Sequence, residues 1–80
     1  MWLFTPDSFI SVVQHRDQPD MLLARARFPG DLGRVFPERE EEVEETPDAD
    51  YRYRLIVGRE EVAHAVANAA RGIDYTNFKS

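Results

Sequence analysis

Alternation of apolar and polar side chains near the start of the chain predicts an antiparallel β-hairpin. Residues 8–15 are rich in β-branched and aromatic side chains, which favour an extended strand. A short lead-in at residues 2–5 is expected to end at Pro6. Residues 16–20 contain proline and aspartate, which are typical of turns. We therefore expect residues 21–28 to return as a strand alongside residues 8–15.

Two of the predicted strands carry apolar side chains on one face and arginine on the other. In residues 21–28 the apolar face consists of Leu22, Ala24, Ala26 and Phe28, and the opposite face of Leu23, Arg25 and Arg27. In residues 51–57 one face consists of Tyr51, Tyr53, Leu55 and Val57, and the other of Arg52, Arg54 and Ile56. Successive side chains of a strand point to opposite sides of the sheet, so both tyrosines are expected in the core.

Two helices are expected, one short and one long. Residues 31–36 form a helix of two turns or fewer, capped by Asp31 and stopped by Pro37. Residues 59–71 form the longer helix, with glutamates in its first turn and arginine in its last, as the helix dipole favours. Gly72 is placed to end this helix.

The order of elements predicts an α+β fold. One weak edge strand is expected at residues 42–45, where charges oppose further pairing. The order is then strand, strand, helix, weak strand, strand, helix, which predicts a small antiparallel sheet with helices on one face. A length of 80 residues fits a single domain, 1–80. After the long helix, Tyr75 and Phe78 are expected to return to the core, because exposed aromatic side chains are unfavourable in a small chain.

Charge is distributed unevenly along the chain. Residues 38–50, called the acidic element below, contain eight acids and one base, a net charge of −7, whereas the whole chain has a net charge of −5. The acids are Glu38, Glu40, Glu41, Glu42, Glu44, Glu45, Asp48 and Asp50. Such a run is typical of a solvated loop or edge strand. It is also compatible with a surface that binds a basic partner in place of a phosphate backbone.

The uncovered face of the predicted sheet collects four cations, Arg25, Arg27, Arg52 and Arg54. We expect the acidic element to fold back and neutralise them, because the chain supplies acids and bases in similar numbers. Sheets that bind RNA stack bases on exposed aromatic side chains. Here the tyrosines are predicted to face the core and the net charge is negative, so direct binding of nucleic acid is not expected.

No catalytic, cofactor or metal site is predicted. The chain has no cysteine, and His15 and His64 lie on different predicted elements without a metal-binding spacing. Its serines lie outside any nucleophile motif. Asp48 and Asp50 have the opening spacing of a calcium loop, but the glycine and the closing glutamate are missing. We therefore expect a protein that is not an enzyme and needs no cofactor.

The N-terminal residues lack the basic region and long apolar core of a signal peptide. No run approaches the roughly 18 apolar residues of a membrane span. We expect a cytoplasmic protein without a membrane partner.

Four segments carry a resemblance to a family. They are Met1-Trp-Leu-Phe-Thr, Phe9-Ile-Ser-Val-Val13, Asp50-Tyr-Arg-Tyr-Arg54 and Ile73-Asp-Tyr-Thr-Asn-Phe-Lys79. In these the chain resembles a small uncharacterised bacterial family with a W-L-x-T…F-x-S-V-V pattern and an I-D-Y-x-N-F-K segment. The resemblance implies that the chain is a short member without the further C-terminal helix of longer members. It implies no activity.

Together these features predict a non-enzymatic protein-binding module. In its sharpest form, the module presents the acids of residues 38–50 to the basic groove of a nucleic-acid-binding complex, as small acidic anti-restriction or anti-CRISPR proteins do. The alternative is a self-associating bacterial regulatory or structural subunit, such as a homodimer formed through the sheet edge or the arginine face.

Overall fold

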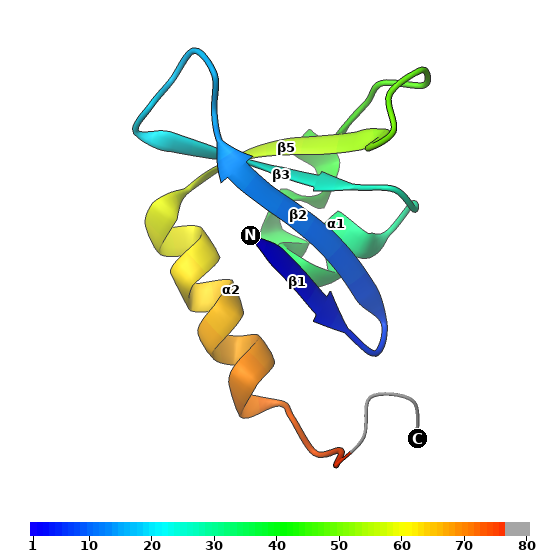
Figure 1. Cartoon of the computed structure of the whole chain (residues 1–80), viewed down its shortest axis with the longest axis vertical. Coiled ribbons are helices and arrows are strands. Elements are labelled where there is room, and N and C mark those ends of the chain that lie inside the picture. The colour runs from blue at the N-terminus through cyan, green and yellow to red at the C-terminus, as the bar shows by residue number, and fades with distance from the viewer. Residues whose placement is uncertain (77–80) are drawn as a thin grey trace.

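Five antiparallel strands form one sheet in the order β1-β2-β3-β5-β4 in the computed structural model, which describes residues 1–76 (Figure 1). The strands are β1 (Trp2–Thr5), β2 (Ser8–Gln14), β3 (Met21–Ala26), β4 (Glu44–Glu45) and β5 (Tyr53–Gly58). The helices are α1 (Asp31–Val35), the 3-10 helix η1 (Pro37–Glu42) and α2 (Arg59–Arg71). The predicted α+β class is confirmed.

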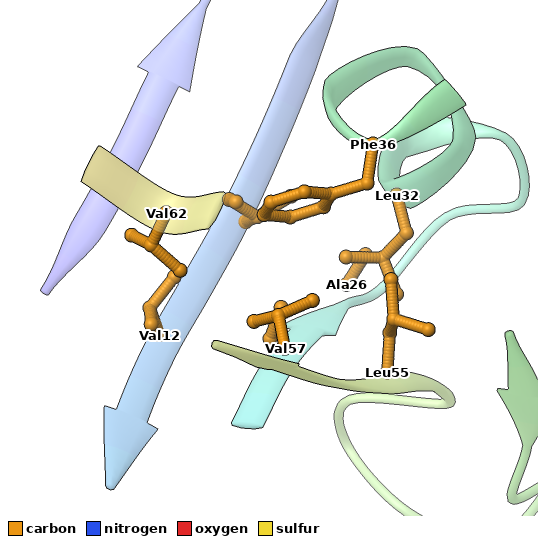
Figure 2. Packing of buried hydrophobic residues seen from close by; sticks show 9 residues of the cluster. Val12, Ala26, Leu32, Phe36, Leu55, Val57 and Val62 are labelled. Atoms are coloured by element: carbon orange, nitrogen blue, oxygen red, sulfur yellow. The ribbon is translucent and has the colours of Figure 1, made fainter. Parts of the chain in front are cut away.

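One face of the sheet packs against the helices to form the core. Alternate residues of the three central strands are buried there, with relative exposures of 5% or less: Ile10, Val12, Ala24, Ala26, Leu55 and Val57. Figure 2 shows Leu32 of α1 pointing toward Leu55 of β5. Phe36, which follows α1, points the other way, toward β2 and Val62 of α2. Burial of these side chains is the main stabilising contribution to the fold.

The short helix α1 begins differently from the prediction. Gly30, not Asp31, occupies the N-cap position, with a φ of 89° that favours glycine. The buried carboxylate of Asp31 instead accepts the backbone N–H of Phe9 at 3.2 Å and a hydrogen bond from Arg34. The pairing of β2 with β3 ends at Ile10 and Ala26, so the next residue of β2, Phe9, has no β3 carbonyl to accept its N–H. Asp31 supplies that acceptor. This bond joins α1 to β2.

Several boundaries differ from the predictions. Strand β1 is a full partner of β2 over four residue pairs, not a lead-in. The strand predicted from residue 51 begins at Tyr53, and Phe28, expected on the apolar face, is exposed. Pro37 ends α1 but also opens η1, which the sequence did not predict. Proline suits the first position of a helix, because its missing N–H has no partner there in any case.

Helix α2 has the bounds predicted from its charges and Gly72. The carboxylate of Glu61 accepts the N–H of Gly58 at 3.1 Å and so caps the first turn. Gly72 forms the C-cap, and its N–H donates to the carbonyl of Asn68 at 3.1 Å. Across residues 1–76, no helix has the length and apolar character needed to cross a membrane.

Candidate functional site

The acidic element runs from η1 through the edge strand β4 to the turn before β5. Its first four acids are in η1, the next two form β4, and the last two lie in the turn that leads to β5. All eight predicted site residues are exposed: Glu38, Glu40, Glu41, Glu42, Glu44, Glu45, Asp48 and Asp50. The predicted residues therefore lie exposed on one consecutive segment of the chain.

Arg39, the one base of the acidic element, attaches η1 to α2. Arg39 donates from Nε and Nη2 to the two carboxylate oxygens of Glu61, at 3.0 and 2.8 Å, and from Nη1 to Glu42 at 3.0 Å. The hydrogen bond that Arg39 donates to Glu61, followed by the one it donates to Glu42, raises the pKa of Arg39 above its usual value. Because Glu61 also caps α2, the same carboxylate joins η1 to the start of that helix.

The backbone of the acidic element is also held. Its N–H groups donate within η1, with Val43 bonded to the carbonyl of Glu40 at 3.3 Å. Beyond β4, Thr46 donates to the carbonyl of Arg52 at 2.6 Å. The side chain of Glu40 lies so close to α1 that a Cβ placed on Gly33 would be 3.0 Å from it. The carboxylates are thus exposed on a backbone with defined partners.

The uncovered side of the sheet, called the open face below, carries cations in the register predicted. Arg25 of β3 lies directly opposite Arg54 of β5. Arg25 donates from Nη2 to the hydroxyl of Ser11 at 2.8 Å, and Arg54 donates from Nε to the carbonyl of Tyr51 at 3.3 Å. Like charges placed directly opposite one another are destabilising, so these neutral acceptors hold an unfavourable pair in place.

The prediction that Tyr51 faces the core is wrong. Its ring lies on the open face, 4.5 Å from the guanidinium carbon of Arg25 and 5.0 Å from that of Arg27. Strand β5 begins only at Tyr53, so Tyr51 does not follow the alternation of the strand. Tyr53 does pack against the core, as predicted. Arg25 Nε is buried without a hydrogen-bond partner among residues 1–76, and the tyrosine ring supplies a cation–π contact to that guanidinium.

Neutralisation of the arginines by the acidic element is confined to one pair. Arg52 lies 4.0 Å from Glu45, at the limit of an ion pair. Within residues 1–76, no carboxylate lies within that distance of Arg25, Arg27 or Arg54. Glu44 is opposite Arg54 in the ladder, yet Arg54 donates to a backbone carbonyl. The two charged regions are neighbours that remain largely separate.

Aromatic side chains from β1 and β2 extend the open face. Trp2 is 72% exposed, and its ring meets that of Phe9 edge to face at a centroid distance of 6.2 Å. Leu3 points to the core between these outward-facing residues. Alternation within residues 2–5 was the signal for this arrangement, but the segment was interpreted as a lead-in.

The other candidate residues do not form a reactive group. The Nδ1 atom of His15 accepts the backbone N–H groups of Asp17 and Gln18, both at 3.1 Å, and so stabilises the hairpin turn. His64 is exposed on α2. In the part of the chain that the structure describes, no three histidine, aspartate or glutamate side chains are grouped to hold a metal ion.

The expected aromatic clamp at the C-terminus lies partly within the described residues. Tyr75 is half-buried and lines a hollow between β1, α1 and α2. Phe78 lies outside the described residues.

Comparison with known proteins gives no relative. A scan against protein-family models finds no match to the chain, and searches of curated proteins and of solved structures also find none. The acidic element and the open face are therefore the features of the molecule from which its function is inferred.

Proposed function

We propose that the protein is a non-enzymatic, cytoplasmic binding module that uses its acidic element to bind the basic surface of a partner protein. The observation that supports this proposal is the combination of eight exposed carboxylates with a backbone anchored to α1, α2 and β5. A solvated run that served only solubility would not need these anchors.

Order in the acidic element matters for affinity. A segment that is already held in its binding conformation loses less conformational entropy on association. Carboxylates on such a segment also increase the rate of encounter with a basic surface. A groove that binds nucleic acid has the required cations, so we propose a nucleic-acid-binding complex as the partner and inhibition by occupancy as the mechanism.

Affinity capture with matched charge variants tests the proposal. One bait carries Glu41→Gln, Glu44→Gln and Asp48→Asn, and the control bait carries Asp17→Asn, Asp20→Asn and Glu60→Gln. All six positions are exposed, and each triple variant raises the net charge equally. A bacterial lysate is treated with nuclease, so that nucleic acid cannot bridge bait and prey, and the bound proteins are eluted with stepwise salt.

The expected result is a basic partner that the native chain and the control bait retain to the same salt concentration. The first variant should release this partner at lower salt, because it has lost charge only from the acidic element. If the first variant and the native chain release their partners at the same salt concentration, the proposal is wrong. Recovery of the bait alone, together with self-association in sedimentation, would favour the alternative of a self-associating subunit.

A further inference from the structure

The open face of the sheet has a different chemistry from the acidic element. Its central row, read across the strands, is Trp2, Ser11, Arg25 and Arg54, and it ends at Glu44 of the edge strand β4. Neighbouring strands are about 4.8 Å apart, so the indole and the first guanidinium begin about 10 Å from each other in one line. Arg27 and the ring of Tyr51 lie beside this row.

Within residues 1–76, the two central arginines of this face form no ion pair. Arg25 and Arg54 are directly opposed, and within residues 1–76 neither has a carboxylate within 4 Å. Ser11 and the Tyr51 carbonyl orient them but do not cancel their charge. An anionic ligand would relieve the repulsion that the opposed pair creates. Charge complementarity therefore indicates an anion on this face.

The aromatic residues indicate which kind of anion. Trp2 is the most exposed aromatic side chain of the face, and it touches Phe9 only edge to face, which leaves ring surface open to solvent. A hollow of about 440 Å³ lies further along the face, lined by Val13, Leu23, Arg25 and Arg54 among others. Aromatic platforms beside arginines bind the bases and phosphates of single strands. In a duplex, the base faces are stacked and cannot reach such a platform.

We propose that the open face binds single-stranded nucleic acid, with a base stacked on Trp2 and phosphates bound by Arg25, Arg27 and Arg54. This site adjoins the acidic element, because Glu44 is the ladder partner of Arg54, but it does not depend on the function proposed for that element. The sequence argued against nucleic acid because Tyr51 was expected in the core, and the structure removes that argument. The net charge of −5 is concentrated in the acidic element. Glu44 of that element is next to Arg54, but Trp2 lies on the opposite edge strand, where screening beyond about 8 Å weakens the influence of the acids at physiological salt.

A titration with labelled oligonucleotides tests this proposal on the full chain. Fluorescein-labelled oligo-dT and oligo-U of about 12 nucleotides, within the site sizes of known single-strand binders, serve as probes for fluorescence anisotropy. Three phosphate contacts predict a slope of about −2 in log K against log salt. Trp2 is the only tryptophan of the chain, so quenching of its emission reports base stacking in the same titration.

Two variants and their two matched controls test whether the oligonucleotide binds to the open face. Trp2→Ala should weaken binding about tenfold, and Arg27→Gln should reduce the salt slope by about 0.7. Their matched controls, Ile73→Ala and Arg71→Gln, change exposed residues at and beyond the end of α2 and should leave both values unchanged. Trp2 and Arg27 are themselves exposed, so circular dichroism should show that all four variants fold.

Any of three outcomes would overturn the proposal. The first is no saturable rise in anisotropy at low salt with either oligonucleotide. The second is tighter binding of duplex than of single strands. The third is a change in sedimentation of the free protein in the Trp2 and Arg27 variants with unchanged oligonucleotide binding, which would assign the face to a second copy of the chain.

Discussion

The acidic element and the open face carry opposite charges and hold them in opposite ways. In the acidic element the backbone is fixed by η1, β4 and Arg39, while the carboxylates extend into solvent. On the open face Arg25 and Arg54 are half-buried, and their side chains are oriented by Ser11 and by the Tyr51 carbonyl. Exposed charges act over a distance and are screened by salt, whereas oriented donors act at short range.

This difference shows why net charge describes the molecule poorly. The net charge of −5 is the sum of two different regions. The acidic element has eight acids, and the central arginines of the open face have no carboxylate partner within residues 1–76. The two regions meet at β5, where Arg52 approaches Glu45 at 4.0 Å.

A cavity in the hydrophobic core that supports both regions should reduce the stability of the fold more than any other change proposed below. Leu32 is 1% exposed and lies between α1 and the sheet. Leu32→Ala should lower the free energy of unfolding by about 2–5 kcal/mol through lost burial and a residual cavity. Domains of this size have roughly 4–12 kcal/mol in total. Urea unfolding measures the change, and a loss below about 1 kcal/mol would contradict the packing described.

Removal of the Tyr51 ring should weaken the open face alone. Tyr51→Ala deletes both cation–π contacts and should cost about 1–2 kcal/mol in urea unfolding. Tyr51→Phe keeps the ring and the backbone carbonyl, so its stability should match that of the native chain. Equal destabilisation by the two substitutions would show that the hydroxyl, and not the ring, is what matters.

Loss of the contact between the acidic element and α2 should reduce stability less, and the change should be confined to the acidic element. Glu61→Gln keeps an acceptor for Gly58 but removes the charge that Arg39 binds. We expect a decrease of a few degrees in Tm and faster cleavage at residues 38–45 by a glutamate-specific protease. Glu60→Gln is the control, because Glu60 is its exposed neighbour in the same helical turn. Identical cleavage rates in the two variants would show that the ion pair between Arg39 and Glu61 does not anchor the acidic element.

Neutralisation of exposed acids should have the smallest effect on folding. The Glu41→Gln, Glu44→Gln and Asp48→Asn triple variant should keep its stability within about 0.5 kcal/mol, with any change toward greater stability at low salt. Thermal unfolding at two salt concentrations measures this. A large loss of stability would mean that these carboxylates hold the fold, and their role as a free binding surface would then be wrong.

Regular elements were predictable where periodicity and end signals agreed. Helix α2 has its glutamates, arginine and glycine at the expected ends. Strands β2 and β3 begin at the predicted residues and end one and two residues earlier than predicted. Helix η1 was missed because Pro37 is a stop signal for one helix and a start signal for the next. The role of Asp31 was missed because its partner, Phe9, is distant in sequence.

The site was predictable in position but not in its contacts. The charge run identified the acidic element, since exposure follows from many like charges in succession. Attachment of that element through Arg39 to Glu61 required knowledge of which helix end lies beside it. Tyr51 was misplaced because alternation was extended past the first residue of β5. Errors of one or two residues at a strand end decide which face a side chain occupies.

Native-state hydrogen exchange tests the central claim, that the acidic element is an ordered surface. The informative amides are those of Arg39, Val43 and Thr46, which donate to Phe36, Glu40 and Arg52 respectively. Our account predicts that all three exchange more slowly than in an unstructured peptide, and that Glu61→Gln accelerates exchange at the first two. Exchange of these amides at the rates of an unstructured peptide in the native chain would contradict it and leave a solvated acidic loop.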